Sequence, residues 1–392
     1  MRRDRTHSWV WMALVAMAVW GCYVGVLPAQ QVGRAPLEVL VLDAPTAATA
    51  LGRLHLVYEL HLTNFGRDAL TLDGLDVLGD DDARITSLTG AQLAQRLVLL
   101  AGSPRSAGRL LQPGGRAVVY LWLTLAPEQR TPPRALVHRF RVITADGTPA
   151  TLATGPVAVR ADTVPLNPPL EGGPWVAVRG PSNSSSHRLS LVTLNGRVTV
   201  PQRFAVDWVR LGDDGLFFRG DGARVQDWYG YDAPVRAAAD GVVVLVRDGA
   251  PDRRPLDVDA PSIVDAAEAP GNVVVVDIGH GVFASYAHLR AGSLRVAEGD
   301  RVSAGQLLGH VGNSGNTQGP HLHFQIASAM EVLGGEGRPF ALSAFMLEGR
   351  VPSVPDLLAG AAWHATATQP ARKVSGELPL ENMVIEFPAR TP

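Results

Sequence analysis

Two histidines separated by one residue, His321 and His323, form the pattern in this sequence with the clearest chemical potential. Residues two apart in a β-strand point to the same face, so both imidazoles would project together while Leu322 and Phe324 point the other way into a core. The preceding loop, 312–319, is rich in Gly and Asn, which lets the backbone approach closely, as a substrate groove requires. Two imidazoles on one face can bind a metal ion or transfer protons. The alternative is a pair of polar residues on an exposed strand face.

A metal ion at this place would have to be bound by histidine and carboxylate side chains. Cys22 is the only cysteine, so neither an intrachain disulfide nor a thiolate zinc site can form within the chain. Within residues 175–347, His187 is the only histidine that precedes the later histidine motifs. It is therefore the candidate for a further imidazole ligand.

The most suitable carboxylate is Asp207, which lies in an apolar strand pattern. An ionised carboxylate there is costly unless a cation or hydrogen-bond donors hold it, and this favours metal binding. One alternative is an ion pair of Asp207 with Arg203 or Arg210. Another is that Asp227 or Asp232, in an aromatic turn, is the carboxylate ligand instead.

These groups must be positioned by strands, because the chain has the patterns of an all-β protein. Within residues 36–162, apolar and polar residues alternate at 54–62, and further strands are predicted at 116–125 and 135–144. Short strands separated by Pro- and Gly-rich turns predict an immunoglobulin-like β-sandwich for this part of the chain.

Within the strand at 54–62, the side chains of His55, Glu59 and His61 share one face. These three residues could form a metal site, but we favour the interpretation that they lie on a solvent-exposed strand face. Because 36–162 contains no other cluster of histidines and carboxylates, we expect this domain to carry no chemistry of its own.

A Pro- and Gly-rich segment at 163–174 is predicted to be a linker that lets the two domains move relative to each other. A second β-rich domain is predicted at 175–347, with strands that include 272–277, 282–289 and 321–326. The segment 348–392, rich in Ala, Pro and Thr, is predicted to be a loosely ordered tail.

The N-terminal segment 1–29 has the pattern of an export signal, with three arginines in its first five residues before an uncharged apolar run. A signal peptidase could cut after Ala29. The apolar run is also long enough to stay as a membrane anchor, and Cys22 could be lipidated in a poor form of the lipoprotein processing box. We expect an exported protein, in the periplasm or attached to the cell envelope, that contacts the membrane only through this segment.

The composition excludes some partners. An apolar fraction of 46% indicates ordinary globular cores. A formal net charge of −2 provides no basic surface for a nucleic acid. No nucleic-acid partner is therefore expected.

Several motifs in one order resemble the lysostaphin-type (LytM-like) zinc endopeptidases of bacterial peptidoglycan. They are Gly-Asn-Val-Val-Val-Val-Asp at 271–277, Ser-Tyr-Ala-His-Leu at 285–289, the Gly-Asp-Arg-Val turn at 299–302 and Gly-Pro-His-Leu-His-Phe at 319–324. The resemblance extends over about residues 176–347. It implies a β-rich fold of the duplicated-hybrid-motif type with one zinc ion in a groove.

The resemblance also implies roles for the site residues. His323 would bind zinc, while His321 acts as general base and His288 stabilises the oxyanion when zinc-bound water attacks the peptide carbonyl. The family usually completes its site with a His-x-x-x-Asp motif, which is absent here. One branch has a hairpin between these two ligands, and 191–200 with its Asn-Gly turn fits such a hairpin. On this basis His187 and Asp207 are the other two zinc ligands.

The implied function is an exported zinc metalloendopeptidase that hydrolyses peptide cross-links of peptidoglycan, with a protein or wall partner bound through the N-terminal domain. The alternative is a non-catalytic relative that binds the wall or activates another wall hydrolase. The turns at 239–242 and 299–308 also resemble biotinyl or lipoyl carriers. Those domains need a lysine at a hairpin tip, and the only lysine here is Lys373.

Overall fold

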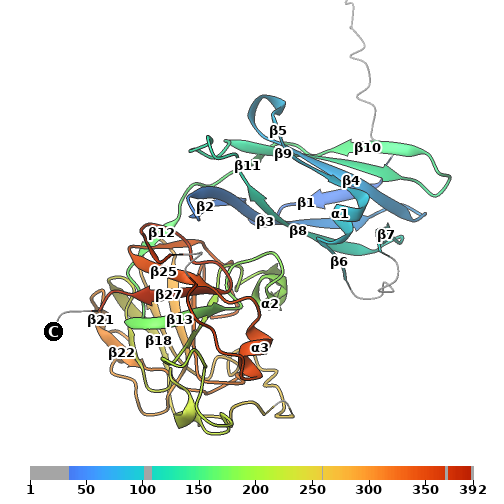
Figure 1. The fold of residues 1–392 in the computed structure, drawn as a ribbon. Helices are drawn as coiled ribbons and strands as arrows, with labels where there is room; N and C mark the ends of the chain where they lie inside the picture. Colours follow the sequence, from blue (N-terminus) through green and yellow to red (C-terminus); the bar gives the residue numbers. More distant parts are fainter. Residues whose placement is uncertain (1–34, 101–107, 258, 367–369, 390–392) are drawn as a thin grey trace, which may run out of the picture.

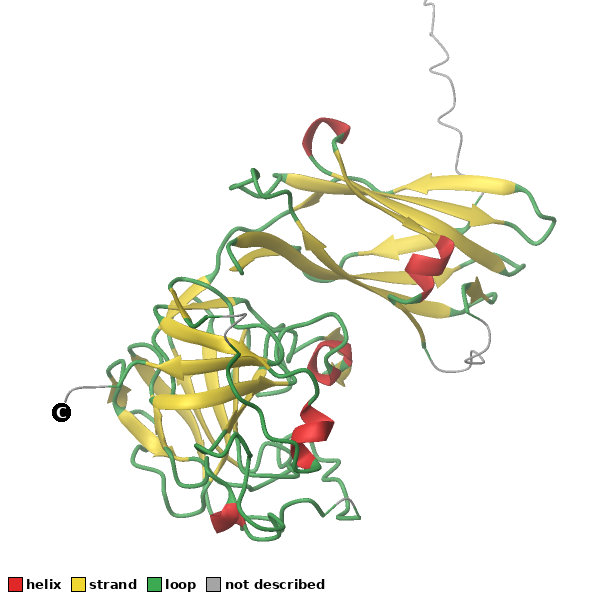
Figure 2. Ribbon diagram, in the orientation of Figure 1, coloured by secondary structure: helices red, strands yellow, loops and turns green. Residues whose placement is uncertain are grey.

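The computed structural model describes residues 35–100, 108–257, 259–366 and 370–389, which form two β-rich domains (Figure 1). The first domain is coloured blue to teal in Figure 1, and the second runs from green to red. Strands dominate both domains and helices are few and short (Figure 2). The predicted all-β class is confirmed. The predicted signal or anchor segment, 1–29, lies outside the described residues.

The first domain is a sandwich of two antiparallel sheets. One sheet has the order β1-β3-β8-β6 with β2 paired to the start of β3, and the other has the order β10-β9-β4-β5 with β11 on β9 and β7 on β4. The strands of the first sheet are β1 (Leu37–Leu40), β2 (Thr46–Ala50), β3 (Arg53–Asn64), β6 (Leu97–Leu99) and β8 (Arg116–Thr124). Those of the second sheet are β4 (Leu70–Leu78), β5 (Arg84–Thr89), β7 (Leu110–Leu111), β9 (Ala135–Ile143), β10 (Pro149–Ala153) and β11 (Val157–Ala158).

One apolar core holds these two sheets together. Leu56 and Leu60 of β3 and Leu121 of β8 face Leu75 of β4 and Phe140 of β9, and all five are fully buried. The strand order agrees with that of immunoglobulin domains, in which A, B, E and D form one sheet and G, F, C and C′ the other. Two short helices, η1 (Asp80–Asp82) and α1 (Gly90–Ala94), connect β4, β5 and β6.

The second domain is built on a ten-stranded sheet with the order β21-β18-β19-β20-β23-β16-β13-β27-β25-β26. Its strands are β13 (Gly172–Val178), β16 (Val206–Arg210), β18 (Gly241–Arg247), β19 (Asn272–Asp277), β20 (Phe283–Leu289), β21 (Arg301–Val302), β23 (Leu322–Ala327), β25 (Phe345–Arg350), β26 (Arg372–Val374) and β27 (Met383–Phe387). Paired segments outside it are β12 (Val164–Leu166) with β24 (Phe340–Leu342), β14 (Val192–Leu194) with β15 (Arg197–Thr199) and β17 (Pro234–Arg236) with β22 (Leu307–His310). The helices are α2 (Ser186–Leu189), η3 (Val225–Asp227) and α3 (Val354–Leu358).

The valine run of β19 explains why this sheet is buried on both faces. Val274 and Val276 pack into the main core of the domain, while Val273 and Val275 join a second cluster on the opposite face. A continuous run of β-branched residues suits a strand that is covered on both sides. The sequence ranges predicted for β19, β20 and β23 agree with the observed strands to within one residue at each end.

The segment 163–174 is not the free linker that its composition predicts. Val164–Leu166 forms β12, which pairs in parallel with β24 of the second domain, and Gly172 already belongs to β13. Thr163 Oγ1 also donates a hydrogen bond to Ala47 O in the first domain. These contacts fix the segment against both domains.

The predicted loose tail, 348–392, is also wrong where the chain forms α3, β26 and β27. β27 lies inside the ten-stranded sheet between β13 and β25, and Val384, Ile385 and Phe387 are fully buried. The sequence does not indicate this strand, because the run Met383–Phe387 is only five residues long and follows the Ala- and Pro-rich segment around α3.

The predicted solvated face on β3 is the interface between the domains. His55, Glu59 and His61 are only 6%, 3% and 5% exposed. Glu59 forms buried ion pairs with Arg188 and Arg203 of the second domain. The predicted free movement of the domains is therefore wrong in this structure, because the ion pairs are enclosed by both domains.

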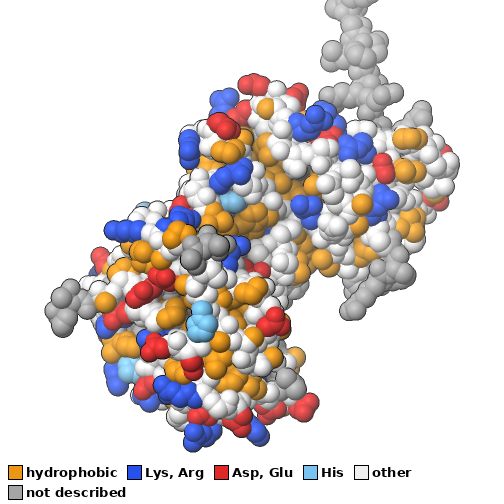
Figure 3. Space-filling view, in the orientation of Figure 1, with side chains coloured by type: hydrophobic (Ala, Val, Ile, Leu, Met, Phe, Trp, Pro, Cys, Tyr) orange, Lys and Arg blue, Asp and Glu red, His pale blue; other side chains and the backbone are white. Residues whose placement is uncertain are grey.

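The charged side chains on the surface agree with the small net charge of the sequence. Figure 3 shows acidic and basic side chains interspersed over the visible face of both domains, in keeping with the net charge of −2. Within the described ranges, no helix has the length and apolar character to cross a membrane.

Candidate active site

The pairing of β16 with β23 brings the carboxylate and the His-x-His pair together. In the antiparallel register, Asp207 lies directly opposite His323, and Trp208 lies opposite Leu322. Trp208, Leu322 and Phe324 are fully buried in the main core. Because alternate residues point to opposite faces, Asp207 and His323 share the other face. The predicted orientation of the His-x-His pair agrees with this arrangement.

His187 reaches the same place from α2, which lies before the hairpin of β14 and β15. The hairpin has the predicted Asn195-Gly196 turn, with φ values of 50° and 74° that suit a two-residue β-turn. The ring of His187 lies edge-on to that of His323 with centroids 4.9 Å apart, and its Nε2 is 3.5 Å from Asp207 Oδ2. One potential ligand atom from each of His187, Asp207 and His323 lies within 4.8 Å of the others.

The protonation of His323 is determined by Gln325, which lies two residues further along the same strand face. Gln325 Nε2 donates to Val332 O at 2.6 Å, so its Oε1 must be the atom that faces His323 Nε2 at 2.9 Å. His323 Nε2 therefore carries the hydrogen and donates it. The Nδ1 lone pair then faces Asp207 Oδ1 at 2.8 Å. Two acceptors this close require a positive charge between them, either a proton or a metal ion.

His321 and His288 have a common arrangement. His321 Nδ1 donates to Gly319 O at 2.7 Å, and His288 Nδ1 donates to Ser314 O at 2.7 Å. In both rings Nε2 keeps its lone pair, since a carbonyl oxygen can only accept. The ring centroids are 4.8 Å apart, and His321 Nε2 is 3.4 Å from Asp207 Oδ1.

A bulge in β20 directs His288 into the site. Val274 pairs with Tyr286 and Asn272 with Leu289, so the two residues Ala287 and His288 lie opposite the single residue Val273. Such a bulge re-aims a side chain. His288 has a φ of 61°, and its backbone is held by hydrogen bonds with Pro270 O and Gly312 N.

Burial controls the charges in the site. It lowers the pKa of His187 to about 4 against the opposing effect of Asp207. Burial, and then the nearby His321 and His323, also lowers the pKa of His288 well below its usual value. Burial alone would raise the pKa of Asp207, but the neighbouring histidines, His187 and His321 first among them, hold that pKa well below the ordinary range. An ionised carboxylate beside neutral imidazoles is the donor set that a divalent cation needs.

The arginine beside Asp207 is not one that the sequence suggested. Arg203 instead pairs with Glu59, and Arg210 lies over the Trp175 ring. Arg179, directly after β13, has its Nη1 3.6 Å from Asp207 Oδ2, and its side chain is 48% exposed. Nothing in the sequence pattern indicates Arg179.

Gln325, by contrast, could have been found from the sequence. It continues the period-two row of His321 and His323 on the same strand face. A glutamine at the next position of such a row is a natural partner for the second imidazole.

The alternative carboxylates lie elsewhere. Asp227 is paired with Arg224, and Asp232 is paired with Arg290 and His310. Among the described residues, the cluster of His187, Asp207 and His323 is the one group of three His, Asp or Glu side chains close enough to hold a metal. Neither Asp227 nor Asp232 belongs to it.

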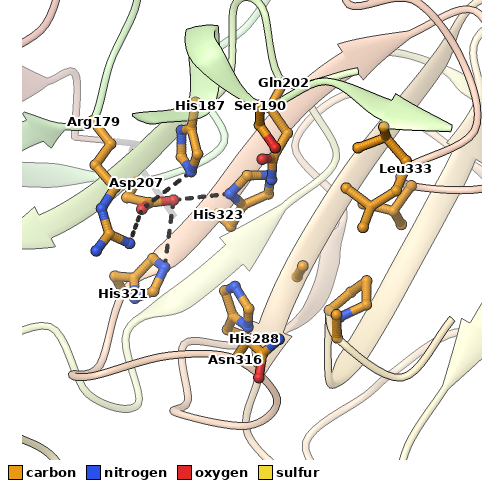
Figure 4. A pocket seen from close by; sticks show the side chains of 15 residues that line it. Arg179, His187, Ser190, Gln202, Asp207, His288, Asn316, His321, His323 and Leu333 are labelled. Carbon is orange, nitrogen blue, oxygen red and sulfur yellow. Dashed lines mark hydrogen bonds and ion pairs between the residues drawn. The ribbon is translucent and has the colours of Figure 1, made fainter. Parts of the chain in front are cut away.

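The cluster opens into a cavity of about 240 Å³ (Figure 4). Its walls are formed by Arg179, Ser190, Val192, Gln202, Ala269, Pro270, Ala287, Asn316, Val332 and Leu333 in addition to the four histidines and Asp207. In Figure 4, Arg179, His187, His321 and His323 surround the Asp207 carboxylate, and His288 lies beyond His321 and His323. A larger cavity of about 730 Å³ shares Arg179, Asp207 and His321 with it and has the apolar wall residues Phe217, Trp228, Leu256, Val354 and Leu358.

The comparisons with known proteins fall on the second domain. Residues 227–334 match the sequence model of Peptidase family M23. The match contains His288, His321 and His323 but begins after His187 and Asp207. The assignment of the last two therefore depends on the geometry described above.

Curated relatives match a short part of the chain. Peptidoglycan DD-endopeptidase ShyA of Vibrio cholerae is 34% identical over 93 residues, which are 24% of this chain and 17% of that protein. DD-carboxypeptidase/endopeptidase Mpg of Neisseria meningitidis is 38% identical over 93 residues, which are 24% of this chain and 16% of that protein. The chain thus matches less than a fifth of the length of these relatives.

Among solved structures, the catalytic domain of the prophage-encoded M23 protein EnpA from Enterococcus faecalis is 19% identical, with 44% of this chain and 92% of that chain covered and a TM-score of 0.26. The catalytic domain of lysostaphin from Staphylococcus simulans is 20% identical, with 42% and 86% covered and a TM-score of 0.23. The family assignment rests on the sequence matches. The chain therefore contains a lysostaphin-type domain of peptidase family M23 at residues 227–334.

Proposed function

We propose that this protein is a zinc-dependent endopeptidase that hydrolyses peptide cross-links of bacterial peptidoglycan. The observation that carries the proposal is the contact of His323 Nδ1 with Asp207 Oδ1 at 2.8 Å. The hydrogen of this imidazole is on Nε2, where it is donated to Gln325 Oε1. A lone pair and a carboxylate oxygen directed at each other suit a cation between them. The curated relatives, named as peptidoglycan and DD-endopeptidases, suggest the class of substrate.

The donor set fits zinc. Two imidazoles and one carboxylate leave one position of a tetrahedral site for water or substrate, as catalytic zinc sites require. His187 Nδ1 is buried without a hydrogen-bond partner, so this ring is not committed to another contact through that atom. His187, Asp207 and His323 would hold the ion. When bound, zinc would lower the pKa of a water molecule towards ~7 and polarise the peptide carbonyl.

His321 is suited to move the proton. Its Nδ1 donates to Gly319 O, which orients the ring and leaves the Nε2 lone pair facing the cluster. Nε2 can accept a proton from the attacking water and return it to the leaving amine. Thr317 Oγ1, 3.2 Å from the same Nδ1, helps to fix the ring.

His288 needs a proton before it can stabilise an oxyanion. Its Nδ1–H is used by Ser314 O, so the neutral ring presents only a lone pair at Nε2. The oxyanion role expected from the sequence therefore requires a ring that has first taken up a proton, and burial, which lowers the pKa of His288, opposes this. In the neutral form His288 is a second proton acceptor beside His321.

The cavities suit a peptide. The catalytic groups line the smaller cavity, and the larger cavity beside His321 offers apolar walls with Arg179 at the junction of the two. An extended peptide could place its scissile bond at the cluster and side chains in the larger cavity. The complete set of His288, His321 and His323 favours an enzyme over a module that only binds the wall.

The proposed site of action is outside the cytoplasmic membrane. Support comes from the basic and apolar pattern of segment 1–29 and from the class of substrate. A fusion of this segment to a reporter that is active only after export would test it.

The test of the function uses the full-length protein. Elemental analysis should find about one zinc per chain, as expected for a three-ligand catalytic site, and the protein should cleave a purified cross-linked muropeptide dimer. The double variant His187→Ala, Asp207→Ala should lose both the zinc and the cleavage, while Asp227→Ala should keep both. Full zinc retention in the double variant would refute the ligand assignment. Zinc binding and wall binding without cleavage by the unaltered protein would indicate the non-catalytic alternative.

A further inference from the structure

The turn that carries His187 has little support of its own. α2 spans only four residues, Ser186–Leu189, and its N-cap Ser185 makes no side-chain capping hydrogen bond. An isolated helical turn of this length is unstable in water, because too few hydrogen bonds offset the ordering of the chain. Contacts from elsewhere must therefore hold His187 in place.

Those contacts come from the β-sandwich through Arg188, the residue after His187. The Arg188 side chain is 0% exposed. Its guanidinium is ion-paired with Glu59 of β3, and Nη2 donates to Tyr58 O at 2.9 Å. The guanidinium also lies over the ring of Tyr120 on β8, 5.1 Å from the centroid. The side chain of a residue adjacent to a candidate ligand is thus enclosed by the other domain.

Glu59 is itself held from the opposite side. Arg203 donates from Nη2 to Glu59 Oε2 at 2.7 Å and from Nε to Oε1 at 3.1 Å. Arg203 also donates to Gly337 O at 3.0 Å and is ion-paired with Glu336 at 2.7 Å. A carboxylate fixed between two buried guanidiniums has little freedom to move. It therefore makes a firm anchor for Arg188.

Tyr120 holds the turn on both sides of His187. Its hydroxyl donates to Leu189 O at 3.3 Å, and its backbone oxygen accepts from Asn183 Nδ2 at 3.0 Å. The segment 183–189 is thus attached to β3 and β8 both before and after the histidine. These contacts come from the central strands β3 and β8, on the face of their sheet that is turned to the second domain.

We infer that the β-sandwich helps to form the metal centre. Glu59 and Tyr120 are positioning residues, which hold the turn of His187 in the position at which its imidazole can bind the metal. The inference rests on the proposed function in taking His187 as a ligand. Neither residue lines the cavity at the metal cluster. They act through Arg188 and through the backbone of 183–189.

The inference is tested on the full-length protein with Glu59→Gln and Tyr120→Phe. Glu59→Gln removes the charge between the two guanidiniums, and Tyr120→Phe removes only a hydroxyl, so the fold is retained in at least the second. The matched control is Asp43→Asn. Asp43 belongs to the same interface and pairs with Arg160, Arg203 and Arg338, but it does not contact 183–189.

Two measurements are made on each protein. Titration of the metal-free protein with Zn²⁺ against a chromophoric chelator gives the zinc Kd. Amide hydrogen exchange of 183–190 in the metal-free protein reports the stability of the turn. We expect the zinc Kd to rise about tenfold in Glu59→Gln, the lower end of the effect known for outer partners of metal ligands. The rise should be smaller in Tyr120→Phe, and exchange in 183–190 should be faster in both variants than in Asp43→Asn.

The two proposals fail in different ways. A wild-type protein that binds no zinc would refute the proposed function, and the exchange rates would still decide whether the sandwich holds the turn. Normal zinc affinity and normal exchange of 183–190 in both folded variants would overturn the inference. Equal effects in Asp43→Asn and Glu59→Gln would also overturn it, because they would indicate a general loosening of the interface.

Discussion

Asp207 on β16 lies directly across from His323 on β23, and its Oδ1 is 2.8 Å from the imidazole Nδ1. Strand pairing alone brings these two residues together, although they are 116 positions apart in the chain. The other ring nitrogen, Nε2, donates its hydrogen to Gln325 Oε1, so a proton or a metal ion must lie between Nδ1 and Oδ1.

The first prediction concerns Gln325, whose Oε1 accepts the hydrogen of His323 Nε2. Gln325→Met keeps the approximate volume but removes this acceptor, so the Nδ1 lone pair is no longer fixed towards Asp207. We expect zinc affinity to fall about 10- to 100-fold, measured by chelator competition. Gln306→Met, at an exposed position, is the control and should bind zinc normally. Equal affinities in the two variants would contradict the role of Gln325.

The second prediction separates proton transfer from metal binding. His321→Ala should reduce turnover of a muropeptide substrate by about 10²- to 10⁴-fold while zinc stays bound. His323→Ala should lose the zinc as well. His288→Ala should keep the zinc and show a smaller loss of turnover than His321→Ala. Equal loss of zinc from the His321 and His323 variants would show that the roles are wrongly divided.

The third prediction concerns the C-terminal strand β27. Phe387 is 1% exposed and packs edge-on against Trp208, with ring centroids 5.1 Å apart. Phe387→Ala should lower the free energy of unfolding by about 3–5 kcal/mol because it leaves a cavity in the core. The neighbouring exposed Glu386 provides the control, and Glu386→Ala should change stability by less than about 0.5 kcal/mol. Urea unfolding followed by tryptophan fluorescence measures both. Similar values for the two would mean that β27 does not support the sheet.

The fourth prediction is a pH dependence of stability. His138 is 0% exposed, and burial lowers its pKa to about 4, while the unfolded value is about 6.5. The neutral folded ring therefore contributes stability that is present above about pH 6.5 and is lost as the pH falls towards 4. Between pH 7 and pH 5 this linkage costs on the order of 2 kcal/mol.

Urea unfolding at the two pH values tests this contribution. His138→Gln should make the difference in unfolding free energy between pH 7 and pH 5 smaller than in the wild type. His280→Gln, at an exposed turn, should leave the difference unchanged. A pH difference that stays the same in His138→Gln would assign the acid sensitivity to other groups.

The fifth prediction concerns the long connection between β18 and β19, from Asp248 to Gly271, which we call the insert; its charge and Pro content suggest that it is functional. Its described residues Ala269 and Pro270 line the smaller cavity and Leu256 lines the larger one. Replacing it with a short Gly/Ser turn should raise the rate on bulky wall fragments relative to a small cross-linked peptide. An unchanged ratio of the two rates would show that the insert does not limit access.

The sequence by itself determined the β-rich class and the main chemical groups. The period-two row of His321 and His323, the valine run of β19 and the Asn195-Gly196 hairpin are local patterns, and each was found where the sequence predicted it. The cost of an unpaired carboxylate on an apolar strand similarly indicated Asp207, which the structure finds beside both histidines.

Only the tertiary structure decided what the sandwich contributes. The row of His55, Glu59 and His61 resembles a solvated strand face, because local alternation cannot distinguish water from a second domain. Arg188 and Arg203 become partners of Glu59 only when two segments more than 120 residues distant from it pack against β3. The strand β27 joins the sheet for the same reason, since its neighbours β13 and β25 are not adjacent to it in sequence. Long-range packing, which no local pattern encodes, thus placed the sandwich beside the turn that carries His187.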